Sequence, residues 1–234
     1  SSSVTEGGST DLITVVLDAQ PTSDVVISVA SSDTDEVTVS DATLTFTAAN
    51  WDTAQTITVT GVDDDLVDGT QTSTVTLSVV DASSDNDFDG VADQTVSVST
   101  TDDDTAGFTV SQTGGSSTVT EGGSTDLITV VLDAQPTSDV VISVASSDTD
   151  EVTVSDATLT FTAANWDTAQ TITVTGVDDD LVDGTQTSTV TLSIVDAISN
   201  DDFDGVADQT VSVSTTDDDT AGFTVSQTDG SSSV

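Results

Sequence analysis

Residues 56–65 read TITVTGVDDD. Ile57 and Val59 alternate with threonine, and this period of two is typical of a half-buried β-strand, because successive side chains point to opposite faces of a sheet. Clusters of Gly, Asp, Asn and Ser separate further runs with the same alternation, at 11–18, 24–30, 36–47, 71–80 and 94–101. We therefore predict an all-β chain of seven-stranded antiparallel β-sandwiches arranged end to end.

The chain repeats itself with a period of 115 residues. Residues 1–115 match residues 116–230 at all but six positions, and the last four residues repeat the first four. Near-identical tandem repeats are typical of quasi-one-dimensional arrays, in which each repeat contacts only its neighbours. We interpret the chain as a window of a longer array or as a processed subunit of a polymer.

The domain boundary is not expected at residue 1. Residues 105–111 have the pattern of an opening strand, which 118–120 continues. A complete second sandwich then spans 106–220, whereas 1–105 forms a first sandwich without its opening strand. Residues 221–234 supply the opening strand of the next repeat or a donor strand for the next subunit. The expected partners are neighbouring copies of the same repeat, and a covalent tandem array and a strand-donating polymer both remain open.

The charge of the chain is one-sided. Of its 234 residues, 43 are acidic and none is Lys, Arg or His, so the formal net charge is −43. Nucleic-acid binding requires a basic surface, and membrane insertion requires a long apolar run, so neither is expected. The absence of cysteine and histidine excludes disulfides, thiolate zinc sites and the usual nucleophiles and bases. A glycosidase needs two spaced carboxylates in a cleft, whereas the acids of this chain are clustered and exposed. We therefore expect no enzyme.

The alternating direction of successive strands is expected to bring the acidic segments together. When successive strands run in opposite directions, four acidic segments of a repeat reach the same end of one domain. Carboxylates gathered without a basic residue take up protons or hold a cation, and a set made only of oxygen ligands selects Ca²⁺. A solvated acidic surface is the alternative. The candidate calcium ligands are Glu6, Asp33, Asp35, Asp63, Asp64, Asp65, Asp68, Asp102, Asp103 and Asp104 in the first repeat, and Glu121, Asp148, Asp150, Asp178, Asp179, Asp180, Asp183, Asp217, Asp218 and Asp219 in the second.

A second acidic element is expected at the opposite end of the repeat. Residues 85–93 read DNDFDGVAD and match the first part of an EF-hand calcium loop, with glycine at its sixth position. The match ends at the twelfth position, where Val96 stands in place of a bidentate Glu. A weak calcium loop and an Asp-rich turn both fit this pattern. The weaker metal candidates are Asp85, Asp87, Asp89, Asp93, Asp202, Asp204 and Asp208.

The order of these motifs resembles that of Calx-β domains, and most closely the Calx-β-like tandem repeats of large bacterial extracellular surface proteins and adhesins. The resemblance is carried by VTEGG at 4–8, LTF at 44–46 with Asn50-Trp51, GVDDD at 61–65 and TDDDTAG at 101–107, and it spans the whole period. It implies an immunoglobulin-like seven-stranded sandwich that binds Ca²⁺ at one tip through the acidic residues named above. Regulatory members carry further Glu residues after the first Asp run, where this chain has only Asp68 and Asp183, so the resemblance does not extend to a graded calcium sensor.

Two functions from different classes fit the sequence. The first is a calcium-stabilised structural repeat of an extracellular bacterial fibre or adhesin stalk, at the cell surface, because identical tandem domains provide length rather than varied recognition. The alternative is an adhesive module that binds a glycan, ice or a host surface through exposed threonine ladders. Threonine is also an ordinary strand residue, so the ladders do not decide between the two.

Overall fold

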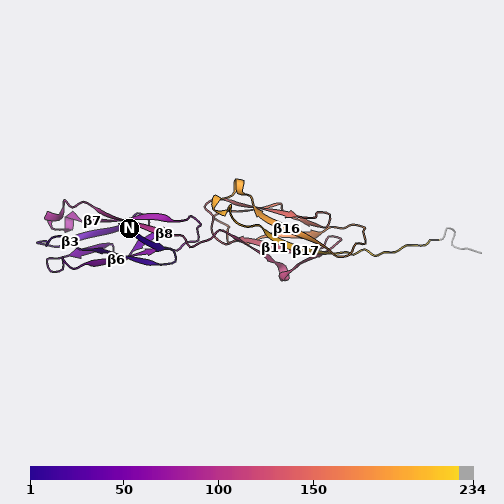
Figure 1. The fold of residues 1–234 in the computed structure, drawn as a ribbon, viewed down its shortest axis with the longest axis horizontal. Helices are drawn as coiled ribbons and strands as arrows, with labels where there is room; N and C mark the ends of the chain where they lie inside the picture. Colours follow the sequence, from indigo (N-terminus) through magenta and orange to yellow (C-terminus); the bar gives the residue numbers. More distant parts are fainter. Residues whose placement is uncertain (227–234) are drawn as a thin grey trace, which may run out of the picture. The chain divides into compact units, whose positions relative to one another are not determined.

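The computed structural model describes residues 1–226 and is all-β (Figure 1). The chain divides into two compact units, Ser1–Thr105 (unit 1) and Ala106–Val234 (unit 2). Besides strands, the described residues contain five 3₁₀ helices of three residues each and no α-helix: η1 (Asp81–Ser83), η2 (Asn86–Phe88), η3 (Thr113–Gly115), η4 (Asp196–Ile198) and η5 (Asp201–Phe203). None of these has the length and apolarity that a membrane crossing requires.

Unit 1 consists of two sheets. The larger has the order β1 (Ser2–Thr5), β8 (Gln94–Thr101), β7 (Gln71–Val79), β3 (Val25–Ser31), β5 (Thr43–Phe46). The smaller has the order β2 (Thr10–Val15), β6 (Gln55–Gly61), β4 (Val37–Val39). One core cluster holds apolar side chains of both sheets, so the sheets face each other as a sandwich. Phe46, Ile57 and Val75 are completely buried in it.

Unit 2 repeats this arrangement and adds one strand. Its larger sheet has the order β10 (Ser117–Thr120), β17 (Gln209–Thr216), β16 (Gln186–Ile194), β12 (Val140–Ser146), β14 (Thr158–Phe161). Its smaller sheet has the order β13 (Val152–Val154), β15 (Gln170–Gly176), β11 (Thr125–Leu132), β9 (Phe108–Gln112). The additional strand is β9, which pairs antiparallel with β11.

The predicted all-β sandwich fold is confirmed, and the alternation seen in the sequence is the burial pattern of the strands. Along β6 the residues on one face, among them Ile57 and Val59, are buried while the threonines between them are more exposed. The free energy of burying these side chains, about 1.5–3 kcal/mol for each large aliphatic residue, is what fixes the strand register.

The topology differs from the one predicted from the sequence at three places. The pair β1–β8, like β10–β17, is parallel. The run 36–47 is divided between the sheets, since β4 belongs to the smaller and β5 to the larger. The opening strand is also divided: β9 lies in the smaller sheet, whereas β10 lies in the larger. Between them, Gly114 and Gly115 adopt the left-handed backbone conformation that this change of sheet uses.

The predicted terminal strand over 221–234 lies partly outside the described residues, which end at 226. Residues 221–226 form no strand in this structure, and Phe223 and Val225 are 91% and 77% exposed.

Candidate metal centre

Glu6 directly follows β1, and its position is set by the parallel pairing of β1 with β8. The Glu6 backbone N–H donates to the Thr101 carbonyl over 3.1 Å, which places Glu6 beside the triplet at 102–104. Gly7 comes next with φ of 74°, and a Cβ added there would lie 3.3 Å from Asp103 Oδ2. The Glu-Gly-Gly motif therefore supplies a carboxylate and then a turn that a larger residue would strain.

The loop after β6 reaches the same end through the pairing of β6 with β4. Gly61 is the register partner of Val37, and the Val62 N–H donates to the Glu36 carbonyl over 2.9 Å. A Cβ on Gly61 would collide with the Thr5 carbonyl oxygen, so glycine lets β6 pass close beneath β1. These contacts bring the acids after β6, the acid before β4 and the acid after β1 to one place.

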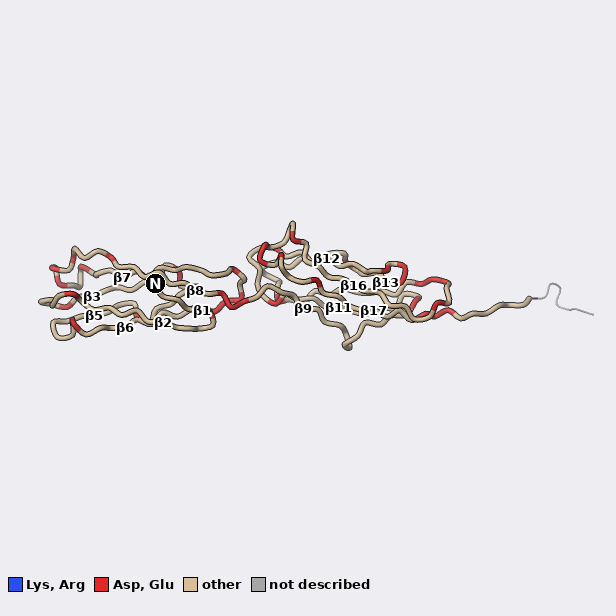
Figure 2. The backbone as a smooth tube through the Cα atoms, viewed as in Figure 1, with Lys and Arg blue, Asp and Glu red and all other residues tan. Residues whose placement is uncertain are grey.

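Two groups of three carboxylates result, and they share one member. One oxygen each from Glu6, Asp64 and Asp104 lie within 4.8 Å of one another, and the same holds for Glu6, Glu36 and Asp68. Figure 2 shows acidic residues gathered in the loops at the ends of the strands and no basic residue anywhere. Glu6 therefore stands between two adjacent positions at which a cation could be held.

The Glu6 side chain is the electrostatic centre of this cluster. It is 4% exposed, and burial together with the charge of Asp64 raises its pKa from 4.5 to about 7. Burial, reinforced by Asp68, also raises the pKa of Glu36, and burial with the charge of Asp102 raises that of Asp104. The protein thus keeps these acids close together at a cost to their ionised forms.

The oxygen atoms of this cluster fit Ca²⁺. Glu6 Oε2, Glu36 Oε2 and Asp104 Oδ2 are buried and have no hydrogen-bond partner. Calcium binds oxygens at 2.3–2.6 Å, so two oxygens on one ion can be at most about 5 Å apart, and the 4.8 Å limit of each group meets that condition. Because the chain contains no Lys, Arg or His, these carboxylates can be neutralised by protons or by an external cation.

Asp102 has a different part in the cluster. Its Oδ2 accepts hydrogen bonds from the backbone N–H groups of Asp68 (3.1 Å) and Gly69 (2.8 Å), and its Oδ1 accepts one from that of Asp104 (2.7 Å). These bonds tie the loop after β6 to the loop after β8. Asp102 therefore positions the cluster by holding its two acidic loops together.

Unit 2 builds its cluster from the equivalent segments. Its two groups are Glu121 with Asp218 and Asp219, and Glu151 with Asp179 and Asp183. Glu121 is 4% exposed and both of its carboxylate oxygens are buried without a hydrogen-bond partner. Burial raises the pKa of Glu121, of Glu151 and of Asp219. The unit 2 groups share no member, in contrast with the groups joined by Glu6 in unit 1.

The structure brings together members of three of the four predicted acidic segments: the residue after β1, the run after β6 and the triplet after β8. From the fourth segment it contributes Glu36 and Glu151, which sequence reasoning did not select, whereas Asp33, Asp35, Asp148 and Asp150 are exposed and lie outside the groups. Asp63, Asp65, Asp103, Asp178 and Asp180 lie in the same loops but also outside the groups. Glu36 and Glu151 each directly precede a buried valine of a strand, and this position was the sequence feature that could have identified them.

The first carboxylate of the loop at 85–93, that of Asp85, has a structural role. Asp85 Oδ2 accepts from the backbone N–H and the hydroxyl of Thr22 (2.7 and 2.8 Å), and Asp85 Oδ1 accepts from Asp87 N–H (3.1 Å). These bonds lower the pKa of Asp85 to about 2. In unit 2, Asn200 makes the corresponding bond to Asp202 N–H over 2.9 Å. The remaining weaker candidates, Asp87, Asp89, Asp93, Asp202, Asp204 and Asp208, are exposed and belong to no metal group among the described residues.

No protein-family model and no curated protein matches the chain. Solved structures resemble it at low identity. The calcium binding domain CBD12 of CALX1.1 is 15% identical, with 82% of this chain and 76% of that chain covered and a TM-score of 0.34. The apo-form Calx CBD1 domain is 17% identical over 48% of this chain and 98% of that chain, with a TM-score of 0.36.

Domains 1–6 of the surface layer protein SbsC are 16% identical to the chain, with a TM-score of 0.39. That match covers 82% of this chain and 20% of that chain. At these identities and TM-scores, the resemblances add nothing to what the strand topology itself shows about the fold.

Proposed function

We propose that the chain is a calcium-stabilised structural repeat of an extracellular bacterial fibre or adhesin stalk, at the cell surface, with no catalytic activity. The observation that supports this most directly is the buried Glu6 carboxylate. It belongs to both of the three-carboxylate groups of unit 1, in a chain with no basic side chain. Bound Ca²⁺ would supply the positive charge there. Glu6, Asp64 and Asp104 would hold one ion, and Glu36 with Asp68 would extend the site.

The proposed partners are neighbouring copies of the same repeat. A 115-residue unit repeated with six differences is suited to building length, because every copy presents the same ends. Calcium between the acidic loops would stiffen the end of each sandwich, since it replaces mutual repulsion of the carboxylates by a shared attraction.

The test is thermal unfolding of the purified chain with calcium and with a chelator. We expect calcium to raise the melting temperatures of both units, because an ion that binds only the folded state stabilises it by mass action. Magnesium at the same concentration serves as a control, since its smaller octahedral shell suits this cluster less well. Equal melting temperatures with calcium and with chelator would contradict the proposed role of calcium.

A further inference from the structure

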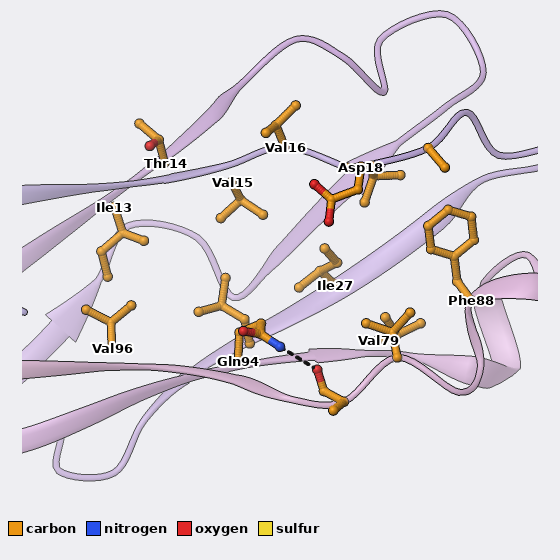
Figure 3. A pocket seen from close by; sticks show the side chains of 15 residues that line it. Ile13, Thr14, Val15, Val16, Asp18, Ile27, Val79, Phe88, Gln94 and Val96 are labelled. Atoms are coloured by element: carbon orange, nitrogen blue, oxygen red, sulfur yellow. Dashed lines mark hydrogen bonds between the residues drawn. The ribbon is translucent and has the colours of Figure 1, made fainter.

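A groove of about 520 Å³ runs along the free edge of β2 in unit 1 (Figure 3). β2 pairs on one side with β6, and no strand of the described residues pairs with its other side. The groove is lined by apolar side chains of the 13–17 segment and of the opposite sheet, including Ile27, Val79, Phe88 and Val96. An unpaired edge of this kind exposes backbone N–H and C=O groups that can bond to an added strand.

Unit 2 shows what fills the equivalent position. There β9 pairs with β11, with Phe108 opposite Leu132 and Val110 opposite Val130. Subtracting the repeat period of 115 places Leu17 and Val15 of unit 1 at the positions of these two β11 residues. Phe108 is 2% exposed, so β9 contributes a fully buried aromatic side chain to unit 2.

The apolar residues around the groove are more exposed in unit 1 than in unit 2. Val130 and Leu132 are buried, at 0% and 2% exposure, whereas Val15 and Leu17 are half-buried. The same holds on the opposite wall, where Phe203 is fully buried and its counterpart Phe88 is half-buried. β2 also ends at Val15, while β11 continues to Leu132 alongside β9. Within the residues that the structure describes, the unit 1 sandwich therefore has one core strand fewer than the unit 2 sandwich.

A polar contact changes in the same way. In unit 2 the Gln209 amide donates to the Phe108 carbonyl of β9. Its counterpart Gln94 lines the groove in unit 1 and instead donates to the Ala92 carbonyl over 3.0 Å (Figure 3). The acceptor that Gln94 would use in a completed unit is the backbone of an added strand.

The chain carries a second segment with the sequence of β9. Residues 221–226 read AGFTVS, identical to residues 106–111. Phe223 is 91% exposed although its counterpart Phe108 is 2% exposed. The molecule thus presents an incomplete apolar groove and, separately, an exposed copy of the segment that completes such a groove.

We propose that the groove along β2 of unit 1 binds residues 221–226 of a second copy of the chain as an added antiparallel strand. Phe223 would lie opposite Leu17 and Val225 opposite Val15, in the register of β9 on β11. Among the described residues the groove and the donor segment are different surfaces, so the contact is head-to-tail and can link copies into a chain of successive subunits. This inference rests on the proposed function insofar as copies of the repeat are its partners, and it assigns the contact surfaces.

The test uses the full chain with two cysteines, Val15→Cys and Val225→Cys, since the natural chain has none. Mild oxidation should yield a ladder of multimers on a non-reducing gel. A chain with Ile198→Cys and Val225→Cys is the matched control, because Ile198 is 63% exposed and lies outside the groove. A disulfide within single chains, or no more multimers than in the control, would overturn the proposal.

A second measurement avoids cysteine. Light scattering on the full chain should show association that grows with concentration. Phe223→Asp should weaken it about tenfold to a hundredfold through the loss of one buried aromatic side chain. Ile198→Asp adds the same charge at another exposed position and should leave association unchanged. If Phe223→Asp associates as the natural chain does, the assigned contact is wrong.

The two measurements also separate this inference from the proposed role of calcium. If multimers form in chelator as well as in calcium and the melting temperatures do not respond to calcium, the result supports the strand contact and refutes the role of calcium. Calcium-dependent melting of a chain that stays monomeric would do the reverse.

Discussion

Replacing Glu6 by glutamine should have opposite effects on the stability of unit 1 with and without calcium. The Glu6 carboxylate has oxygens within 4.8 Å of those of Asp64 and Asp104. Two ionised groups at that separation repel by about 3.5 kcal/mol at an effective dielectric constant of 20. Asp64 and Asp104 are half-buried, so water screens part of this repulsion. We expect removal of the Glu6 charge to stabilise metal-free unit 1 by about 1–2 kcal/mol, roughly half of the unscreened repulsion.

With calcium present, the same substitution removes a ligand shared by two groups. A hundredfold loss of affinity lowers the stabilisation from saturating calcium by about 2.7 kcal/mol. In calcium this loss outweighs the gain in metal-free stability and leaves the variant about 1 kcal/mol less stable than the natural chain. The variant should therefore melt above the natural chain in chelator and below it in calcium. The measurement belongs at pH 8, where a carboxyl with a pKa of about 7 is mainly ionised. At about 4 °C for each kcal/mol, both shifts are measurable.

The chain offers an internal control for this experiment. Each repeat has one tryptophan, Trp51 or Trp166, and there is no tyrosine. In a Trp166→Phe background, tryptophan fluorescence reports the unfolding of unit 1 alone, and Trp51→Phe isolates unit 2. Glu6→Gln should shift the first signal and leave the second unchanged. Shifts of the same sign in calcium and in chelator would refute the electrostatic reasoning.

Two further predictions concern pH and the loop at 85–93. Because the folded-state pKa of Glu6, about 7, lies above its ordinary value of 4.5, the metal-free fold binds the proton more tightly than the unfolded chain does. The contribution of Glu6 to the stability of metal-free unit 1 should therefore be fully present at about pH 4.5 and be lost as the pH rises through about 7. A melting temperature that rises between pH 4.5 and 7 would contradict the assignment. Asp85→Asn should leave the calcium response of unit 1 unchanged, as Asn200 in unit 2 suggests, while Asp85→Ala should lower its melting temperature by several degrees in calcium and chelator alike. A calcium-dependent loss in Asp85→Asn would instead favour a metal loop.

Much of the fold followed from local pattern. The alternation at Ile57 and Val59 marked a strand correctly because burial on one face of a sheet imposes a period of two on any sequence. The exchange of sheets near Ser40 and at Gly114–Gly115 did not follow, since both halves of each run have the same alternation. Which sheet a strand joins depends on pairing with residues far away in the chain.

The carboxylate cluster was predictable only in part. Direction along the strands placed the ends of β1, β6 and β8 together, which is a property of chain order alone. Selection of Glu36 over Asp33 and Asp35 depended on which side chain turns inward next to Val37, and a residue pattern does not give that orientation. Asp102 is a second example. The sequence predicted it as a calcium ligand together with Asp103 and Asp104, whereas in the structure its carboxylate accepts hydrogen bonds from backbone N–H groups.

The charge, the repeat and the strands follow from the amino-acid sequence alone, because these are properties of composition and of neighbours along the chain. The position of Glu6 in two acidic groups, and the different surroundings of identical segments, follow only from the three-dimensional fold. Phe108 and Phe223 have the same neighbours in sequence, yet one is buried and the other exposed. The difference arises because Phe108 has the edge of β11 beside it, and burial depends on what lies nearby in space.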